Sequence, residues 1–560
     1  MAIIPTEFGG DAEPQIFETS LDPSTTEPWA PMLQHECSFG PNSFVDAMMN
    51  LIRNPNINSS WLFRADILLA RNNTEDEDAT ATATARDLTG PEGDAKGKTE
   101  PRIVDFTGFM REKTLIRKLI PRNEKRDKPL DQTCLIYRSF ASKNDQSLEG
   151  EGQGKQQAQE QDKNELQQKS LVVYIPHLSS ASEVPFYHPS VRGIGFLHTW
   201  NPTAKSGSIS IHYKFFPEDD KQGQERPKKL CRTALALITV LHKHGTGNEG
   251  GYVKRVHHDA LVAQARLQNR YAELKMKHAA RLVRGWAEVT DPEKHVFEDL
   301  GIAAFLIELW DDMYAKEKRP FPGFVDIGCG NGLLVHILNL EGYQGWGFDA
   351  RVRKSWEVYR KGEPGHESLQ QRVLLPSLVS RPEPAPQGAE ATVDYDDDDT
   401  FVLDEEKIHD GKFPQGTFIV SNHADELTPW TPILAAQSNC PFMMIPCCSH
   451  NLAGSRQRAP APKNKNKSMS AYSSLVCWVA EIAEDCGWEP ETEMLRIPST
   501  RNTAIIGRRL LVQNTRNTAV VGRERVFEDV DLGDIVGKYG GTEGYYENVR
   551  KLSVVSPRGH

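Results

Sequence analysis

The 560-residue sequence predicts an α/β fold whose C-terminal part is an open, doubly wound sheet. A short apolar run, Gly323 to Ile327, is followed by a glycine-rich turn and by the helical pattern Leu333 to Leu340. A second strand-like run, Gly345 to Asp349, comes directly after that helix. Strand, helix and strand in this order form a βαβ unit, which implies a parallel sheet. Further strands are expected at Thr417 to Ser421 and Phe442 to Pro446.

An α+β extension is expected ahead of this sheet. Its strands are predicted by runs of β-branched and aromatic residues, and its helices by apolar residues at helical spacing. The strands are expected at Leu171 to Ile175 and Ser208 to Phe216, and the helices at Arg232 to His244 and Asp259 to Ala287. Asp291 followed by Pro292 predicts the start of one more helix, which runs to about Tyr314 and leads into the sheet.

Four stretches contain few large apolar side chains and are expected to be disordered insertions or linkers. They cover residues 72–98, 144–169, 382–400 and 456–468. The sequence therefore divides into an N-terminal segment (1–71), a linker (72–101), a basic segment (102–143), a low-complexity linker (144–170), an α+β region (171–285), a main domain (286–535) with inserted loops at 382–400 and 456–468, and a C-terminal tail (536–560).

A short duplication lies near the end of the main domain. The segment Arg501 to Arg508 recurs in closely similar form as Arg516 to Arg523. Two copies are too few for a solenoid. They predict either two similar strands at the sheet edge or a tandem duplication without a role.

Composition limits the compartment and the partners. The nine cysteines form no CxxC pair, which favours reduced thiols in an intracellular protein. The N-terminus lacks a signal-peptide pattern, and the most apolar run, Thr233 to Leu241, is too short to cross a bilayer. We therefore expect a soluble cytoplasmic protein without a membrane partner. The net charge of −11 is not that of a generally basic nucleic-acid binder, although a local basic face can still bind RNA.

The glycine-rich turn indicates the ligand. Gly328, Gly330 and Gly332 follow Asp326 at alternate positions, and such glycines let the backbone approach a ligand closely. A dinucleotide site favours G-x-G-x-x-G, and here the third glycine falls one place early. An acid two residues before the first glycine suits a cationic ligand better than a pyrophosphate. The pattern D-x-G-x-G-x-G is similar to that of Rossmann-like, class I methyltransferases, which bind S-adenosylmethionine (SAM).

A second acid supports this interpretation. Asp349 ends the next strand, where a carboxylate can accept hydrogen bonds from ribose hydroxyls. Asn331 lies within the turn and Asn422 follows a later strand. The residues expected to bind SAM are Asp326, Gly328, Gly330, Asn331, Gly332, Asp349 and Asn422.

The loop after the Thr417 to Ser421 strand contains candidate bases. His423, Asp425 and Glu426 should emerge at the carboxyl edge of the sheet. A ribose 2′-hydroxyl is a poor nucleophile until its proton is removed, so a methyltransferase acting on oxygen benefits from a nearby base. An equally favoured alternative is that Asp425 or Glu426 caps the next helix.

The segment Pro446 to Asn451 should lie beside this loop. His450 is a candidate catalytic or substrate-orienting group, and a packed core histidine is the alternative. Cys447 and Cys448 invite a zinc interpretation, but adjacent cysteines are poorly spaced for one tetrahedral ion. We therefore predict no metal.

Basic residues cluster outside these motifs. They fall into a first group (Arg111, Lys113, Arg117, Lys118, Arg122, Lys125, Arg126 and Lys128) and two smaller ones (Lys228, Lys229 and Arg232; Lys463, Lys465 and Lys467). Each group, taken by itself, is most simply explained as a solvent-exposed face. Their number in an acidic protein favours a local nucleic-acid surface.

Four motifs together carry a family resemblance. Phe324 to Leu334, Gly345 to Arg351, Asn422 to Trp430 and Ile445 to His450 resemble the fungal tRNA (uracil-2′-O-)-methyltransferase family, most clearly from about 280 to 510. The resemblance implies that uridine 44 of serine tRNA is methylated on its ribose, with tRNA as the partner and no DNA. We expect the N-terminal region, including the accessory α+β region 171–285, and the basic loops to hold the tRNA. The sequence leaves open a different RNA or protein substrate, a catalytically idle RNA-binding subunit and a dinucleotide-dependent oxidoreductase, which the glycine spacing disfavours.

Overall fold

The computed structural model describes residues 29–73, 99–124, 126–139, 167–217, 227–252, 258–360, 368–381, 405–462, 470–511 and 531–554. The chain divides into two compact units, Met1–Arg255 and Val256–His560. Most of the predicted linkers 72–101 and 144–170, the whole loop 382–400, the second half of the loop 456–468, and the second duplicated copy, Arg516 to Arg523, lie outside the described residues.

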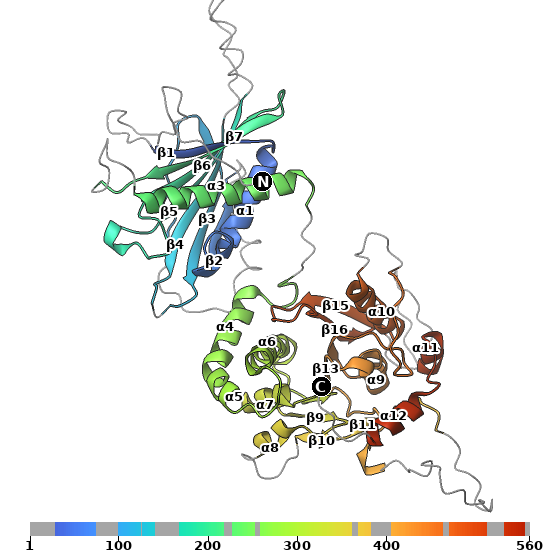
Figure 1. Ribbon diagram of the computed structural model, residues 1–560. Helices are drawn as coiled ribbons and strands as arrows, with labels where there is room; N and C mark the ends of the chain where they lie inside the picture. Colours follow the sequence, from blue (N-terminus) through green and yellow to red (C-terminus); the bar gives the residue numbers. More distant parts are fainter. Residues whose placement is uncertain are drawn as a thin grey trace, which may run out of the picture. The chain divides into compact units, whose positions relative to one another are not determined.

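The first unit is a seven-stranded antiparallel sheet with two long helices (Figure 1). The strand order is β1-β7-β6-β5-β4-β3-β2. In chain order the elements are β1 (Ala30–Cys37), α1 (Pro41–Arg53), η2 (Pro55–Ile57), β2 (Leu62–Asn72), β3 (Phe109–Pro121), β4 (Leu130–Ser139), β5 (Gln168–Pro176), η3 (Ala181–Glu183), β6 (Gly193–Asn201), β7 (Ser206–Lys214) and α3 (Lys228–Glu249).

Helices α1 and α3 cover one face of this sheet. Phe44 of α1 and Leu237 of α3 share a core cluster with alternate strand residues such as Ile136. The strand residues between them face the opposite side, where Leu135 packs with Trp29. A strand residue therefore contributes to one cluster or the other according to its position in the alternation.

The second unit is built on a mixed seven-stranded sheet. The order is β10-β9-β8-β13-β14-β16-β15, parallel from β10 to β14 and antiparallel over the last two pairs. The strands are β8 (Phe324–Ile327), β9 (Gly345–Asp349), β10 (Leu369–Gln371), β13 (Phe418–Asn422), β14 (Phe442–Ile445), β15 (Trp488–Met494) and β16 (Thr503–Leu510). A small second sheet pairs β11 (Val373–Leu374) with β12 (Ile408–His409).

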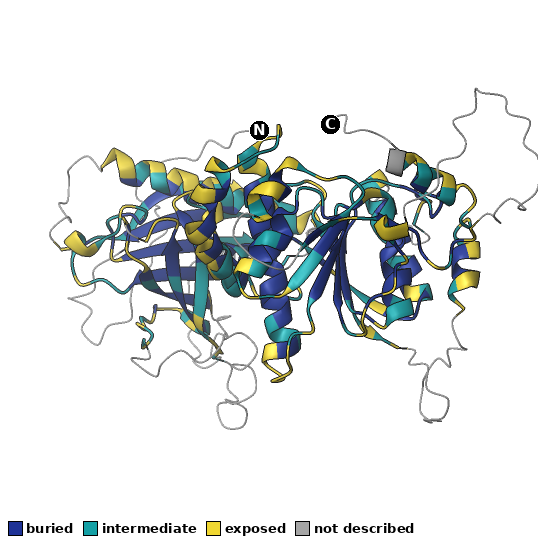
Figure 2. Cartoon of the chain, turned by 90° about the horizontal axis from the view of Figure 1, so that it is seen from below, coloured by how far each residue is buried: buried dark blue, intermediate teal, exposed yellow. Residues whose placement is uncertain are grey.

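Helices cover both faces of this sheet. Phe324 and Val420 pack with α6 and α7, whereas Val325 and Ile419 pack with α9, α10 and α12. Figure 2 shows the strands as buried and the outer faces of the helices as exposed. The helices are α4 (Gln264–Leu274), α5 (Ala280–Arg284), α6 (Pro292–Trp310), α7 (Leu333–Leu340), α8 (Lys354–Arg360), α9 (Thr431–Ser438), α10 (Ala471–Asp485), α11 (Leu532–Lys538) and α12 (Tyr545–Val554), with π-helical turns η4 (Lys275–Ala279) and η5 (Asp311–Ala315) and 3-10 turns η6 (Glu405–Lys407) and η7 (Asp425–Leu427).

The α/β class is confirmed, and the βαβ unit has the predicted bounds at Leu333–Leu340 and Gly345–Asp349. Helix α6 begins as expected, because the Asp291 side chain accepts a hydrogen bond from the backbone N–H of Glu293 at 3.0 Å. The first duplicated copy lies in β16, which is not at the edge of the sheet but between β14 and β15. None of the described helices is long and apolar enough to cross a membrane.

The helix predicted from Asp259 to Ala287 starts later than expected and is interrupted. The Glu493 carboxylate accepts hydrogen bonds from the backbone N–H groups of Asp259, Ala260 and Leu261 at 2.6, 2.8 and 2.8 Å. Asp259 also has a φ of 64°, which a right-handed helix excludes. The helix therefore begins only at Gln264, and the π-helical turn η4 then separates α4 from α5.

The C-terminal residues contribute to the core of this unit. Ile535 and Val536 of α11 and Tyr545 and Val549 of α12 are buried against the sheet layer. The sequence placed residues 536–560 in a tail, whereas the structure describes ordered helix as far as Val554. Short amphipathic helices of this kind carry too few apolar residues to be recognised without their packing partner.

Candidate functional site

The glycine-rich turn connects β8 to α7, and its three glycines have left-handed backbone angles. The angle φ is 72° at Gly328, 51° at Gly330 and 73° at Gly332, a region that residues with a Cβ atom seldom adopt. A Cβ atom at Gly330 would meet no atom within 4 Å, whereas one at Gly332 would lie 2.6 Å from Leu369. Gly330 therefore borders open space, and Gly332 is required by packing.

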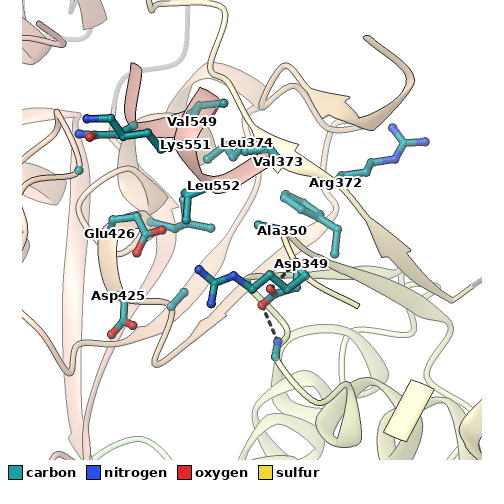
Figure 3. Close-up of a pocket in the computed structure, with 18 of the residues that line it drawn as sticks. Asp349, Ala350, Arg372, Val373, Leu374, Asp425, Glu426, Val549, Lys551 and Leu552 are labelled. Atoms are coloured by element: carbon teal, nitrogen blue, oxygen red, sulfur yellow. Dashed lines mark hydrogen bonds between the residues drawn. The ribbon is translucent and has the colours of Figure 1, made fainter. Parts of the chain in front are cut away.

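A cavity of about 530 Å³ lies beside this turn at the carboxyl ends of the parallel strands (Figure 3). Its size is within the range of small-molecule and cofactor sites. Loops that follow the strands supply most of its wall, and helix α12 closes another side. The cavity is lined by Gly328, Gly330, Phe348, Asp349, Ala350, Arg351, Arg353, Arg372, Val373, Leu374, His423, Ala424, Asp425, Glu426, Leu427, Gly454, Tyr545, Asn548, Val549, Lys551 and Leu552.

Asp349 connects the two predicted motifs. Its Oδ2 accepts a hydrogen bond from the backbone N–H of Gly330 at 3.0 Å, and its Oδ1 accepts one from that of Arg351 at 3.0 Å. Figure 3 shows the carboxylate on the cavity wall, with the Asp425–Glu426 turn on the other side. A carboxylate oxygen accepts more than one hydrogen bond, so Asp349 can still bind hydroxyl donors of a ligand.

A buried acidic cluster lies behind the glycine-rich turn. Asp326 is 1% exposed, and its Oδ1 has no hydrogen-bond partner among the residues that the structure describes. Burial raises the pKa of Asp326 well above its ordinary value, and Asp299 and Asp349 raise it further. Burial also raises the pKa of Asp299 to about 8, with a further contribution from Glu298. Both carboxyl groups accept a hydrogen bond from Asn422, and because buried charges are costly, their raised pKa values favour the neutral, protonated form.

Sequence reasoning missed Glu298 and Asp299, which contact two of the predicted site residues. Both lie on α6 and are buried. Asp299 Oδ1 accepts a hydrogen bond from Asn422 Nδ2 at 3.4 Å, and Glu298 Oε1 lies 3.2 Å from His423 Nε2. The available signal was two adjacent acids inside a helix that is otherwise largely apolar. Tyr545 and Asn548 of α12 were also missed, and no local pattern distinguishes them.

Four predicted cofactor residues do not line the cavity themselves. Asn331 Oδ1 accepts a hydrogen bond from the backbone N–H of Leu333 at 2.9 Å, which caps the first turn of α7. Asn422 Oδ1 and Asp326 Oδ1 are buried and have no hydrogen-bond partner within the described part of the chain. Gly332 packs under Leu369. Gly328, Gly330 and Asp349 are the predicted cofactor residues on the cavity wall.

The candidate bases after β13 are at the cavity. His423 and Asp425 line it, and both have left-handed φ values, 53° and 45°. Glu426 also lines it, and burial raises the pKa of its carboxyl. The capping alternative is not supported, because α9 begins only at Thr431 and its N-cap residue is Trp430, not Asp425 or Glu426.

The Pro446 to Asn451 segment lies beside this loop. Cys447 Sγ donates a hydrogen bond to Asp425 Oδ1 at 3.1 Å, and one ligand atom each from Asp425, Cys447 and Cys448 lie within 4.8 Å of one another. Three such groups are fewer than the four ligands of a structural zinc site. His450 is buried at 8% exposure and is not on the cavity wall. The absence of a metal stays a prediction.

The basic residues separate into structural and exposed groups. Arg117 is buried and donates hydrogen bonds to the carbonyl oxygens of Leu51 and Ile52 at 3.2 and 2.7 Å, where it caps the end of α1. Exposed members of the first unit are Arg122, Arg126, Lys128, Lys228, Lys229 and Arg232. Lys125, Lys463, Lys465 and Lys467 lie outside the described residues.

Two family models match the chain, one over each unit. Residues 7–255 match a model described as a TRM44-like, N-terminal bet v1-like domain. Residues 261–376 match a model described as a predicted AdoMet-dependent methyltransferase, a description that implies a Rossmann-like fold. The second match contains both the glycine-rich turn and Asp349.

Curated relatives match over nearly the whole chain. A protein of Neurospora crassa is 52% identical over 553 residues, which is 98% of this chain and 97% of the relative. Proteins of Saccharomyces cerevisiae and Schizosaccharomyces pombe are each 36% identical, over 93% and 95% of this chain and 92% and 94% of their own lengths. All three are named tRNA (uracil-O(2)-)-methyltransferase.

Proposed function

Because this chain belongs to the TRM44-like family of tRNA (uracil-O(2)-)-methyltransferases, we propose that it methylates the ribose 2′-oxygen of a uridine in tRNA. The family membership, the methyltransferase class and the cofactor SAM that were expected from the sequence are confirmed. The observation that carries the proposal is the Asp349 carboxylate, which joins the two SAM motifs at one cavity through its hydrogen bond with Gly330.

The residues at this cavity fit SAM. Gly330 leaves room for close approach of the cofactor, and Asp349 is placed to accept hydrogen bonds from its ribose hydroxyls. Asp326 and Asp299 do not line the cavity, so these buried acids are assigned an indirect role behind its wall. Asn331, Gly332 and Asn422 are assigned the indirect role of shaping the turn and the acidic cluster. When bound, SAM supplies a methyl group activated by its sulfonium.

The chain itself must orient the 2′-hydroxyl and take its proton. Asp425 and His423 are assigned this task because both line the cavity on the loop after β13. His423 is oriented by Glu298 at 3.2 Å. His450 is assigned a positioning role, because it does not line the cavity itself and follows Cys447, which contacts the cavity residue Asp425.

The proposal extends to the methylated nucleotide, the fold class and the cellular location. Uridine 44 of serine tRNA as the acceptor is supported by the resemblance of the Asn422 to Trp430 and Ile445 to His450 motifs. The doubly wound, class I arrangement is supported by helices on both faces of the sheet. A cytoplasmic location and the absence of DNA or membrane partners stay predictions from the sequence.

The test uses purified full-length protein, tritiated SAM and an unmodified tRNA transcript. We expect transfer of label to tRNA and a thermal shift with SAM but not with NAD. A shift with NAD alone would favour an oxidoreductase. Binding of tRNA without any transfer would favour an idle RNA-binding subunit, and transfer to a protein but not to tRNA would contradict the proposed substrate.

A further inference from the structure

The first unit carries an exposed pair of aromatic rings. Trp61 and Phe186 are 42% and 55% exposed, and their ring centroids are 5.1 Å apart at an interplanar angle of 73°. A single exposed aromatic residue is common on protein surfaces. Two exposed aromatic rings in contact, from segments far apart in sequence, form a specific surface that the proposed catalytic site does not use.

Two cations lie against these rings. The Arg126 guanidinium is 5.2 Å from the centroid of the Trp61 ring, and Lys229 Nζ is 4.7 Å from that of Phe186. Arg126 belongs to the first basic group in the sequence and Lys229 to the second. The fold therefore brings two separate basic groups together around one aromatic pair.

The surrounding backbone holds this surface in place. The Trp61 carbonyl oxygen accepts a hydrogen bond from the backbone N–H of Arg122 at 2.9 Å, and the Tyr187 hydroxyl donates one to the carbonyl of Lys128 at 2.7 Å. Beneath it, Leu62, Leu119 and Leu130 form a small buried cluster with Tyr187 packed against it. Trp61 directly precedes β2, and Phe186 lies in the β5–β6 loop, which the Tyr187 hydrogen bond ties to the β3–β4 loop.

The local charge favours an anionic ligand. Arg122, Arg126, Lys128, Lys228 and Lys229 are exposed around the pair. Asp127 is buried, and the exposed acids of the β3–β4 and β5–β6 loops are Glu124 and Glu183, of which Glu183 accepts a hydrogen bond from the backbone N–H of Ser179 at 2.8 Å. Aromatic faces flanked by cations are the usual means by which proteins bind unpaired nucleotides, since bases stack on the rings and phosphates meet the cations.

We propose that Trp61 and Phe186, with Arg126 and Lys229, form a stacking platform for unpaired bases of the tRNA substrate. This inference rests on the proposed function, because that function supplies an RNA ligand. The platform binds the RNA, while chemistry takes place at the SAM cavity of the second unit.

The aromatic contribution is tested by fluorescence anisotropy with the full-length protein and a labelled, unmodified serine tRNA transcript. We expect the double variant Trp61→Ala and Phe186→Ala to bind roughly 5- to 150-fold more weakly, the range for loss of one stacked base. Tyr252→Ala removes another exposed aromatic residue of the same unit and should bind like wild type. Trp61→Phe with Phe186→Tyr should restore binding, because flat rings are retained. A perfectly paired RNA duplex should bind equally well to the wild-type protein and to the double alanine variant, because it has no unpaired base to stack.

The cationic contribution has a different readout. Arg126→Gln with Lys229→Gln should lower the slope of log affinity against log salt by about one for each phosphate that the protein no longer neutralises, whereas the aromatic variant should leave the slope unchanged. Lys243→Gln, at an exposed position on α3, is the matched control.

The outcomes separate this inference from the proposed function. If the double aromatic variant binds tRNA as tightly as Tyr252→Ala does, the platform is refuted, and the pair serves another ligand such as an acidic protein. Wild-type protein that binds tRNA through the pair but transfers no methyl group would refute the proposed function alone. Wild-type protein that binds no tRNA would refute both.

Discussion

Replacing Asp349 with asparagine tests the cofactor site most sharply. The change keeps the size of the side chain and one oxygen acceptor. It removes the negative charge and one of the two oxygens that accept from Gly330 and Arg351 at 3.0 Å. An amide group facing these N–H donors or a ribose hydroxyl cannot accept a hydrogen bond through its nitrogen.

The expected loss of SAM affinity follows from the hydrogen bond between the Asp349 carboxylate and a ribose hydroxyl of SAM. A hydrogen bond to a charged acceptor contributes about 1.5–3 kcal/mol, and about 1.4 kcal/mol changes a dissociation constant tenfold. Asp349→Asn should therefore weaken SAM binding roughly 10- to 150-fold. The fold should persist, because Asp349 lies on the cavity wall and not in the core.

Isothermal titration with SAM measures this effect directly. Asp410→Asn is the matched control, because Asp410 Oδ1 also accepts a hydrogen bond from the backbone N–H two residues on, that of Lys412 at 3.0 Å, and lies away from the cavity. Its SAM affinity should equal that of wild type. If Asp349→Asn also binds SAM within about twofold of wild type, the assignment of Asp349 is wrong.

Three further predictions concern the same unit. Gly332→Ala should lower the melting temperature more than Gly342→Ala. Both variants incur the left-handed backbone cost of about 1–2 kcal/mol, but only Gly332→Ala brings a Cβ atom to 2.6 Å from another side chain. Equal losses of melting temperature would contradict the packing role of Gly332. Burial raises the pKa of Asp299 to about 8, so the folded protein keeps a proton that the unfolded chain loses near pH 4. The melting temperature should therefore fall as the pH rises from about 4 to about 8. Asp299→Asn should flatten this fall, and an unchanged profile would show that Asp299 ionises normally. Asp425→Asn should lower turnover roughly 10²- to 10⁴-fold with SAM affinity retained, as measured by single-turnover methyl transfer; turnover near that of wild type would assign the base to His423.

The sequence predicted the βαβ unit closely because its signals are local. A glycine-rich turn ends β8 and starts α7, so strand and helix bounds are visible without knowledge of the rest of the chain. The same motif identified Gly328, Gly330 and Asp349, which lie together at the cavity. The same short segment therefore determines both the local fold and three of the residues at the cavity.

Other parts of the site depend on contacts between distant segments. Asp299 meets Asn422 only after α6 packs on the sheet, and Tyr545 reaches the cavity only because α12 folds back onto it. In the first unit, Ala30–Cys37 pairs with Ser206–Lys214, and no periodicity reveals such a partner. The contact between Trp61 and Phe186 likewise becomes visible only in the folded structure.

Mapping the methylated product tests the proposed methyl acceptor most directly. Unmodified serine tRNA is incubated with SAM and the full-length protein, digested to nucleosides and fragments, and analysed by mass spectrometry. We expect one 2′-O-methyluridine at position 44. A methyl group on the uracil base, on another nucleotide, or on no nucleotide of a tRNA that the protein binds would contradict the proposed function.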